Sequence, residues 1–183
     1  MALRPFSLIF YMTKTRLLIL LLVQALCFPA LSGNISKRYK TYRSELGTLY
    51  FIMPQKMAKA KGCTAQKDLL FDVTCQLWTD SVTVAATVKS SLPVTDSIVK
   101  ISLPDNNILT YPLEFIYRDL DKKGYDNRIK FRMPRQQFRQ MFNGSTPFLL
   151  DFGKGNLFSF RQSQWAKEQD QMNSILEMME LNK

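Results

Sequence analysis

The chain has 183 residues, of which 46% are apolar, and a formal net charge of +10. This composition excludes global disorder and is sufficient for one domain with a hydrophobic core. The chain contains no histidine, which excludes Ser-His-Asp and Cys-His catalysis and nearly all catalytic zinc and copper sites.

The N-terminus has the layout of a secretory signal. Lys14 and Arg16 precede the apolar run Leu17–Leu26, and small residues follow up to Ser32. The run is shorter than the roughly 20 residues that span a bilayer, and its flanks are typical of a cleavable signal. We expect residues 1–32 to be a signal peptide, with translation starting at Met12. The product would be periplasmic or secreted; the alternative is an uncleaved signal anchor.

The chain that remains after cleavage is basic by itself. Removing residues 1–32 leaves 22 basic and 15 acidic residues, a net charge of +7. No further segment predicts a transmembrane span. The excess of cations suits contact with phosphates, acidic glycans or anionic lipid head groups, and it also suits solubility alone.

The two cysteines that remain after signal removal predict a disulfide. Cys63 and Cys75 are separated by eleven residues, and an even number of cysteines in an exported protein favours pairing. A loop of this size would stabilise the fold by about 3 kcal/mol. The alternative is two reduced thiols in a cytosolic protein.

Alternation of apolar and polar residues predicts most of the strands. Residues 33–45 are expected to be a polar lead-in to a single domain, residues 46–183. Leu46–Met53 is the first expected strand, ended by Pro54 and followed by a basic loop or short helix, Gln55–Lys67. Further strands are expected at Leu69–Trp78, Val82–Val88, Val99–Leu103, Leu109–Tyr117 and Arg128–Met133. Pro112 places Leu109–Tyr117 at a sheet edge or at a bulge, because proline cannot donate a ladder hydrogen bond.

The C-terminal part combines two expected helices with a hairpin. Pro134–Phe142 favours a short helix with proline in its first turn, and Phe148–Arg161 a hairpin. From Ser163 to about Glu180 one helical stripe is apolar; it contains Trp165, Met172, Ile175, Leu176 and Met179. The pattern predicts an all-β fold, mainly an antiparallel sandwich or partly open barrel of roughly eight strands. A short helix near 134–142 and a C-terminal helix near 163–180 complete it.

A group of five cations is the most distinctive surface feature that the sequence predicts. Its members are Arg128, Lys130, Arg132, Arg135 and Arg139. Strand alternation directs Ile129, Phe131 and Met133 to the core and the first three cations to solvent. The five side chains could form an anion-binding strip. The alternative is that they protect an exposed sheet against edge pairing.

No pattern in the sequence indicates a metal, a cofactor or specific nucleic-acid binding. Asp119, Asp121 and Gly124 match the opening of an EF-hand loop, but Lys123 and Lys130 occupy positions that a calcium loop needs for ligands. A solvated turn is therefore expected there.

The order of elements in residues 97–180 resembles that of the bacterial invasion-associated locus B proteins. A strand ends at Leu103-Pro104, a short helix spans Arg135–Phe142, and a hairpin at Thr146–Arg161 precedes a terminal helix. The resemblance implies an exported β-sandwich with disulfides. The further cysteines of that family have no counterpart in this region.

These observations predict an exported, non-catalytic binding or accessory module at the cell envelope. Its partner would be an anionic envelope component or a protein, bound through the basic face. The alternative is a hydrolase or another enzyme that uses carboxylates on an all-β scaffold.

Overall fold

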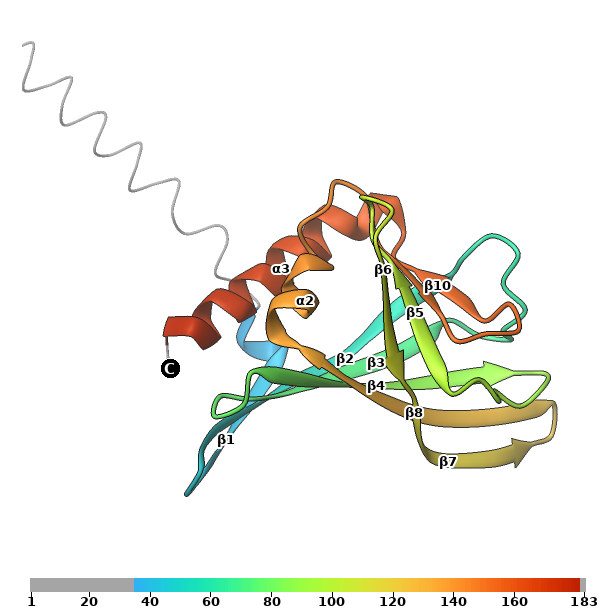
Figure 1. The fold of residues 1–183 in the computed structure, drawn as a ribbon, viewed down its shortest axis with the longest axis horizontal. Coiled ribbons are helices and arrows are strands. Elements are labelled where there is room, and N and C mark those ends of the chain that lie inside the picture. The colour runs from blue at the N-terminus through green and yellow to red at the C-terminus, as the bar shows by residue number, and fades with distance from the viewer. Residues whose placement is uncertain (1–34, 182–183) are drawn as a thin grey trace, which may run out of the picture. The chain divides into compact units, whose positions relative to one another are not determined.

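The computed structural model describes residues 35–181 (Figure 1). In its strands, buried side chains alternate with more exposed ones. In β4 (Ser81–Ser90), Val82, Val84, Ala86 and Val88 are buried, and the residues between them are half-buried on the other face. This is the period of two expected for a strand with one face on a core.

The other elements follow in chain order. The remaining strands are β1 (Tyr39–Ser44), β2 (Gly47–Lys59), β3 (Leu69–Gln76), β5 (Ile98–Ser102), β6 (Ile108–Pro112), β7 (Glu114–Asp121), β8 (Gly124–Pro134), β9 (Leu149–Asp151) and β10 (Leu157–Ser159). The helices are the short 3-10 turn η1 (Ile35–Lys37), α2 (Arg135–Gln140) and α3 (Gln162–Leu181).

The strands form one open antiparallel sheet, which confirms the predicted all-β fold with its two helices. The order is β6-β5-β9-β10-β2-β3-β4-β8-β7, and β1 pairs with β2 beside this path. Helices α2 and α3 lie on one side of strands β2, β3, β4 and β8 (Figure 1). We call the opposite side of β1, β2, β3, β4 and β8 the open face, because no helix among the described elements covers it.

Helix α3 packs on the sheet through the stripe that the sequence predicts. All five residues of that stripe are buried: Trp165, Met172, Ile175, Leu176 and Met179. The Trp165 ring lies 5.7 to 5.9 Å, between ring centroids, from those of Phe142, Phe148 and Phe160. Its indole N–H donates to the carbonyl of Gly144 at 2.9 Å. The terminal helix is therefore part of the core.

Strand β2 continues through Pro54, where the sequence pattern predicted its end. Its pairing with β3 shifts between Ile52 and Gln55, and a bulge of this kind tolerates a proline that cannot join the ladder. The first half of β2 pairs with β1, and Ala58 and Lys59 pair with β10. Residues 55–59, predicted as part of a basic loop or short helix, therefore belong to a strand that joins two parts of the sheet.

The expected strand Leu109–Tyr117 is two strands. Leu113 is buried, and its N–H donates to the carbonyl of Ser97 at 2.8 Å. This contact extends the β5–β6 register by one residue, and from Glu114 on the chain pairs with β8 instead. Strands β6 and β7 therefore lie at opposite ends of the sheet order. Pro112 closes the edge strand β6, in agreement with the predicted edge position.

The predicted disulfide between Cys63 and Cys75 does not form in the structure. Cys75 lies near the end of β3 and pairs with Tyr50, whereas Cys63 lies in the loop that precedes the other end of β3. Leu69, at that loop end, is six residues from Cys75, or about 20 Å along an extended strand. A disulfide requires Cα atoms within about 7 Å of each other.

Candidate binding surface

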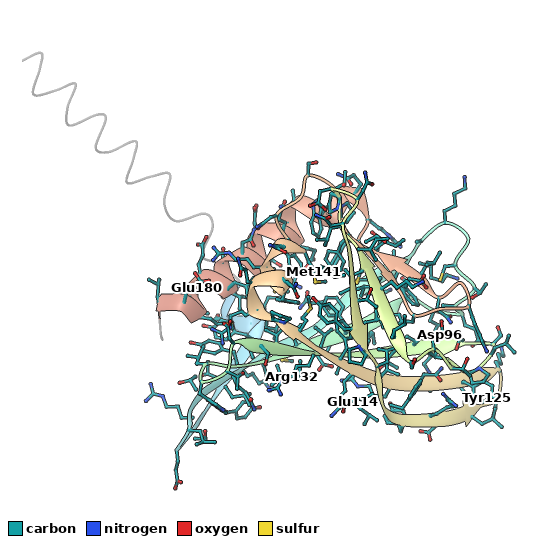
Figure 2. The ribbon with its side chains drawn as sticks, in the orientation of Figure 1. Asp96, Glu114, Tyr125, Arg132, Met141 and Glu180 are labelled. Atoms are coloured by element: carbon teal, nitrogen blue, oxygen red, sulfur yellow. The ribbon has the colours of Figure 1, made fainter. Side chains whose placement is uncertain are left out.

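Register places a row of side chains across five strands of the open face. The row consists of Lys40, Phe51, Thr74, Thr83 and Arg132, one from each of β1, β2, β3, β4 and β8. Their neighbours in sequence point to the core, so these side chains point away from it. Figure 2 shows Arg132 on β8, away from Met141 in the helical layer. Neighbouring strands are ~4.8 Å apart, so the backbones of Lys40 and Arg132 are about 19 Å apart across the sheet.

The alternation predicted for β8 is confirmed. Ile129, Phe131 and Met133 are at most 1% exposed. Arg132 is exposed, and Arg128 and Lys130 are half-buried on the open face. A slip by one residue would have exchanged the two faces.

Two of the three cations on β8 are already paired. Arg128 forms an ion pair with Asp72 and donates to the hydroxyl of Thr87 at 3.0 Å. Lys130 Nζ lies 2.9 Å from a carboxylate oxygen of Glu114. Asp72 lies on the open face of β3, but its side chain is covered by this pairing and the residue is 6% exposed.

The structure separates Arg135 and Arg139 from the strip. Arg135 is buried, and its guanidinium donates to the carbonyls of Gln76 at 2.9 Å and Thr79 at 2.5 Å. It therefore ties the β3–β4 turn to helix α2. Arg139 Nη1 donates to both carboxylate oxygens of Glu180 on α3, at 2.7 and 2.9 Å. Of the five predicted cations, only Arg132 is exposed and without an ion pair among the described residues.

Lys40 is a functional candidate that the sequence reasoning missed. It is exposed, lies at the other end of the row from Arg132, and forms no ion pair within the described range. The signal was present in the alternation of Tyr39–Ser44, but that stretch was interpreted as a polar lead-in. Apolar side chains accompany the row: Phe51 is half-buried and Leu70 is 48% exposed.

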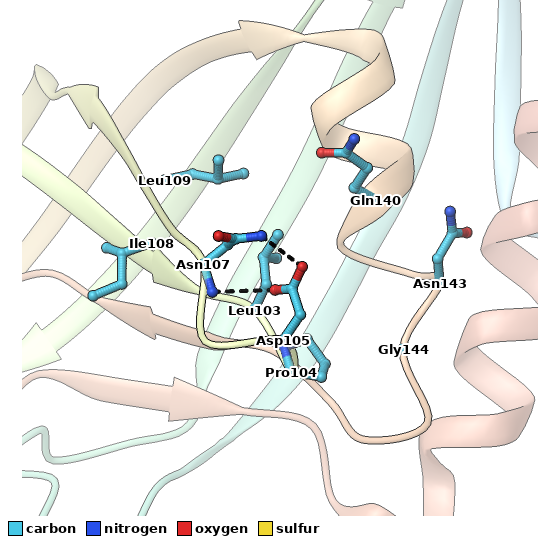
Figure 3. Close-up of a pocket in the computed structure, with 9 residues that line it drawn as sticks. All are labelled: Leu103, Pro104, Asp105, Asn107, Ile108, Leu109, Gln140, Asn143 and Gly144. Carbon is cyan, nitrogen blue, oxygen red and sulfur yellow. Dashed lines mark hydrogen bonds between the residues drawn. The ribbon is translucent and has the colours of Figure 1, made fainter.

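A pocket of about 400 Å³ lies between the β5–β6 turn and the end of α2 (Figure 3). Asp105 in its wall accepts hydrogen bonds from the backbone N–H of Asn107 at 3.1 Å and from its side-chain amide at 2.6 Å. These polar groups therefore satisfy each other. Neither Lys nor Arg lines the pocket, so it offers no cation to an anionic ligand.

A second cleft, of about 290 Å³, contains two carboxylates and three cations. The charged residues that line it are Arg38, Lys56, Asp68, Arg161 and Glu168. Arg38 Nη1 is 3.5 Å from a carboxylate oxygen of Glu168, and Lys56 Nζ is 3.2 Å from one of Asp68. Each acid thus has a cation of its own.

The pKa of Asp68 is lowered from its usual value of 3.8. Burial alone would raise this pKa, but hydrogen bonds from Lys56 and the backbone N–H of Lys59 outweigh it, together with the charges of Lys56 and Arg161. Asp68 is thus held in its charged form as one half of the ion pair with Lys56.

Metal ligands, membrane spans and related proteins give no further indication of function. Within residues 35–181, no group of three or more acidic, cysteine or histidine side chains is arranged to hold a metal ion. No helix in the same range is long and apolar enough to cross a membrane. No family model, curated protein or solved structure matches this chain. The resemblance to invasion-associated locus B proteins thus has no support from these comparisons.

Proposed function

We propose that this chain is exported and acts as a non-catalytic module that binds an anionic component of the cell envelope through its open face. The observation that carries the proposal is the pair Lys40 and Arg132. Both side chains are exposed on that face, and neither forms an ion pair within residues 35–181.

The spacing of this pair favours a large anion over a small one. The backbones of the two residues are about 19 Å apart, since four strand spacings separate them. Half-buried Phe51, Thr74 and Thr83 lie between them. An extended polyanion or an anionic surface contacts both cations at once, whereas a single phosphate contacts one. The net charge of +7 after signal removal attracts such a partner over a longer range.

Export is supported by the N-terminal sequence. Lys14, Arg16 and the apolar run that follows them lie outside the described residues, so this part of the proposal rests on the signal pattern. The basic charge of the remaining chain suits an environment of anionic lipids and glycans.

A double substitution, Lys40→Gln with Arg132→Gln, tests the binding surface. The probes are a sulfated glycan and vesicles rich in an anionic phospholipid. Affinity for at least one probe should fall about tenfold or more, because each cation near an anionic surface contributes roughly 1 kcal/mol. Added salt should weaken binding of the unmodified domain as well.

The matched control is Lys61→Gln with Lys167→Gln, which removes the same charge from exposed positions in the β2–β3 loop and on α3. We expect this control to retain most of the affinity. An equal loss in both double variants would mean that net charge alone governs binding, and the open face would then have no specific role.

A further inference from the structure

Among the described residues, 35–181, two strands of the sheet have one edge without a partner and are exposed along their length. All eight residues of β7 are exposed, and β7 pairs only with β8. Five of the six residues of β1 are exposed, and β1 pairs only with β2. Such edges present unpaired N–H and C=O groups to any further strand.

The edge of β7 is apolar as well as exposed. Its exposed large side chains, with their exposed fractions, are Phe115 (40%), Ile116 (51%), Tyr117 (44%) and Leu120 (77%). A long apolar edge of this kind promotes pairing with another strand. The side chain of Arg118 bonds to the carbonyl of Val94 and to Asn127, so β7 is fixed to the domain.

Asp119 gives this edge an unbalanced negative charge. Register places Asp119 directly opposite Asp126 of β8, and like charges in that arrangement repel. Lys89 Nζ lies 2.6 Å from Asp126. No ion pair within residues 35–181 includes Asp119. A cation on an added strand would relieve this repulsion.

The edge of β1 carries the opposite charge. Lys40 and Arg43 are exposed on it, and the strand contains no acid. Lys40 points to the open face, as Asp119 does on β7, because Lys40 pairs with Phe51 and Asp119 with Asp126. The two free edges are thus complementary in charge and in the face on which the charges lie.

We propose that β1 of one copy of this chain adds antiparallel to the free edge of β7 of a second copy. The register that keeps both open faces on one side places Lys40 opposite Asp119 of the second copy. It also places Tyr42 opposite Tyr117 and Tyr39 opposite Leu120 of the second copy. Opposite charges and aromatic pairs are favourable partners across strands.

Pairing of β7 with itself is disfavoured in three registers. An antiparallel pairing about Arg118, Asp119 or Leu120 sets two like charges opposite each other, which destabilises the pair. Joining β1 to β7 uses a different edge of each copy, so each copy retains one free edge. Such a contact does not close, and it produces chains of copies rather than a dimer.

Sedimentation velocity of the mature domain over a wide range of concentration tests the assembly. The unmodified domain should form species that grow beyond a dimer as concentration rises. Lys40→Glu and Asp119→Lys should each weaken association about tenfold or more, because like charges then oppose each other. The combination Lys40→Glu with Asp119→Lys should restore assembly, because the pair is reversed.

Mixing the two single variants identifies the edges. Each variant alone sets like charges opposite each other, but in the mixture Lys40 of one variant meets Asp119 of the other, and the two substituted residues also carry opposite charges. The mixture should therefore recover chains that grow with concentration and in which the two variants alternate. Circular dichroism and thermal melting confirm that each variant is folded. Asp119→Lys leaves Lys40 and Arg132 in place, which separates this test from that of polyanion binding.

Two outcomes would overturn the proposal. A domain that stays monomeric at every concentration lacks the contact. A domain that stops at a dimer, and does so equally with Asp119→Lys, associates through another surface such as β1 with β1.

Discussion

Among the ion pairs on the open face, the one between Asp72 and Arg128 should contribute most to the stability of the fold. Arg128→Gln would leave a carboxylate that is 6% exposed without its cation. A covered charge that loses its partner costs about 1–3 kcal/mol. We therefore expect urea unfolding to show a loss of this size, and Arg132→Gln to change stability by no more than about 0.5 kcal/mol. Equal effects of the two substitutions would show that Asp72 is solvated.

The two cysteines should differ in reactivity. Cys75 is fully buried, whereas Cys63 is half-buried in a loop. Accessible thiols react with alkylating reagents and buried ones do not. In the folded, unreduced domain, Cys63 should therefore be labelled, and Cys75 only after unfolding. Peptide mapping by mass spectrometry distinguishes them. If both thiols were protected until a reductant is added, the two cysteines would instead form the disulfide that the sequence predicts.

The sequence predicts whether a strand side chain points to the core or to solvent better than it predicts which residues that side chain contacts. Alternation was sufficient to place Ile129, Phe131 and Met133 in the core, because a strand on a core has only two faces. It could not show that Asp72 lies beside Arg128, since that contact depends on which strands are neighbours. The same limit explains why the predicted strip contained Arg135, which is buried against backbone carbonyls.

At the scale of elements, two prolines show what pattern reasoning can and cannot predict. Pro112 was expected at an edge or a bulge, and it closes edge strand β6. Pro54 was expected to end a strand, but the bulge between Ile52 and Gln55 accommodates it. Both positions obey the rule that proline cannot donate to the ladder. A bulge arises from pairing with another strand, so the local sequence does not reveal it.

The division of Leu109–Tyr117 has a similar cause. Every second residue from Leu109 to Tyr117 is apolar, so the local pattern predicts one strand. The division arises because β6 pairs with β5, whereas β7 pairs with β8. This division has a functional consequence, because it allows β7 to form a separate exposed edge.

At the scale of the molecule, the two proposals share Lys40. Chains that grow through β1 and β7 would keep all open faces on one side, but Lys40 would then be paired with Asp119 of the neighbouring copy. Arg132 would be repeated in each copy as the cation left for a polyanion. Several weak contacts to one polyanion then combine, and avidity exceeds the affinity of a single domain.

The last prediction concerns the whole chain and its processing. If residues 1–32 are a signal peptide, protein isolated from its native envelope should begin near Leu31–Asn34, as measured by mass spectrometry. Leu20→Arg should block export and leave the precursor intact, because a charge in the apolar run costs roughly 3 kcal/mol at the centre of a membrane. Leu70→Arg, on the exposed open face, is the control and should be processed normally. An intact N-terminus at Met1 or Met12 in cytosolic protein would contradict export. The basic open face would then need a cytosolic anion as its partner.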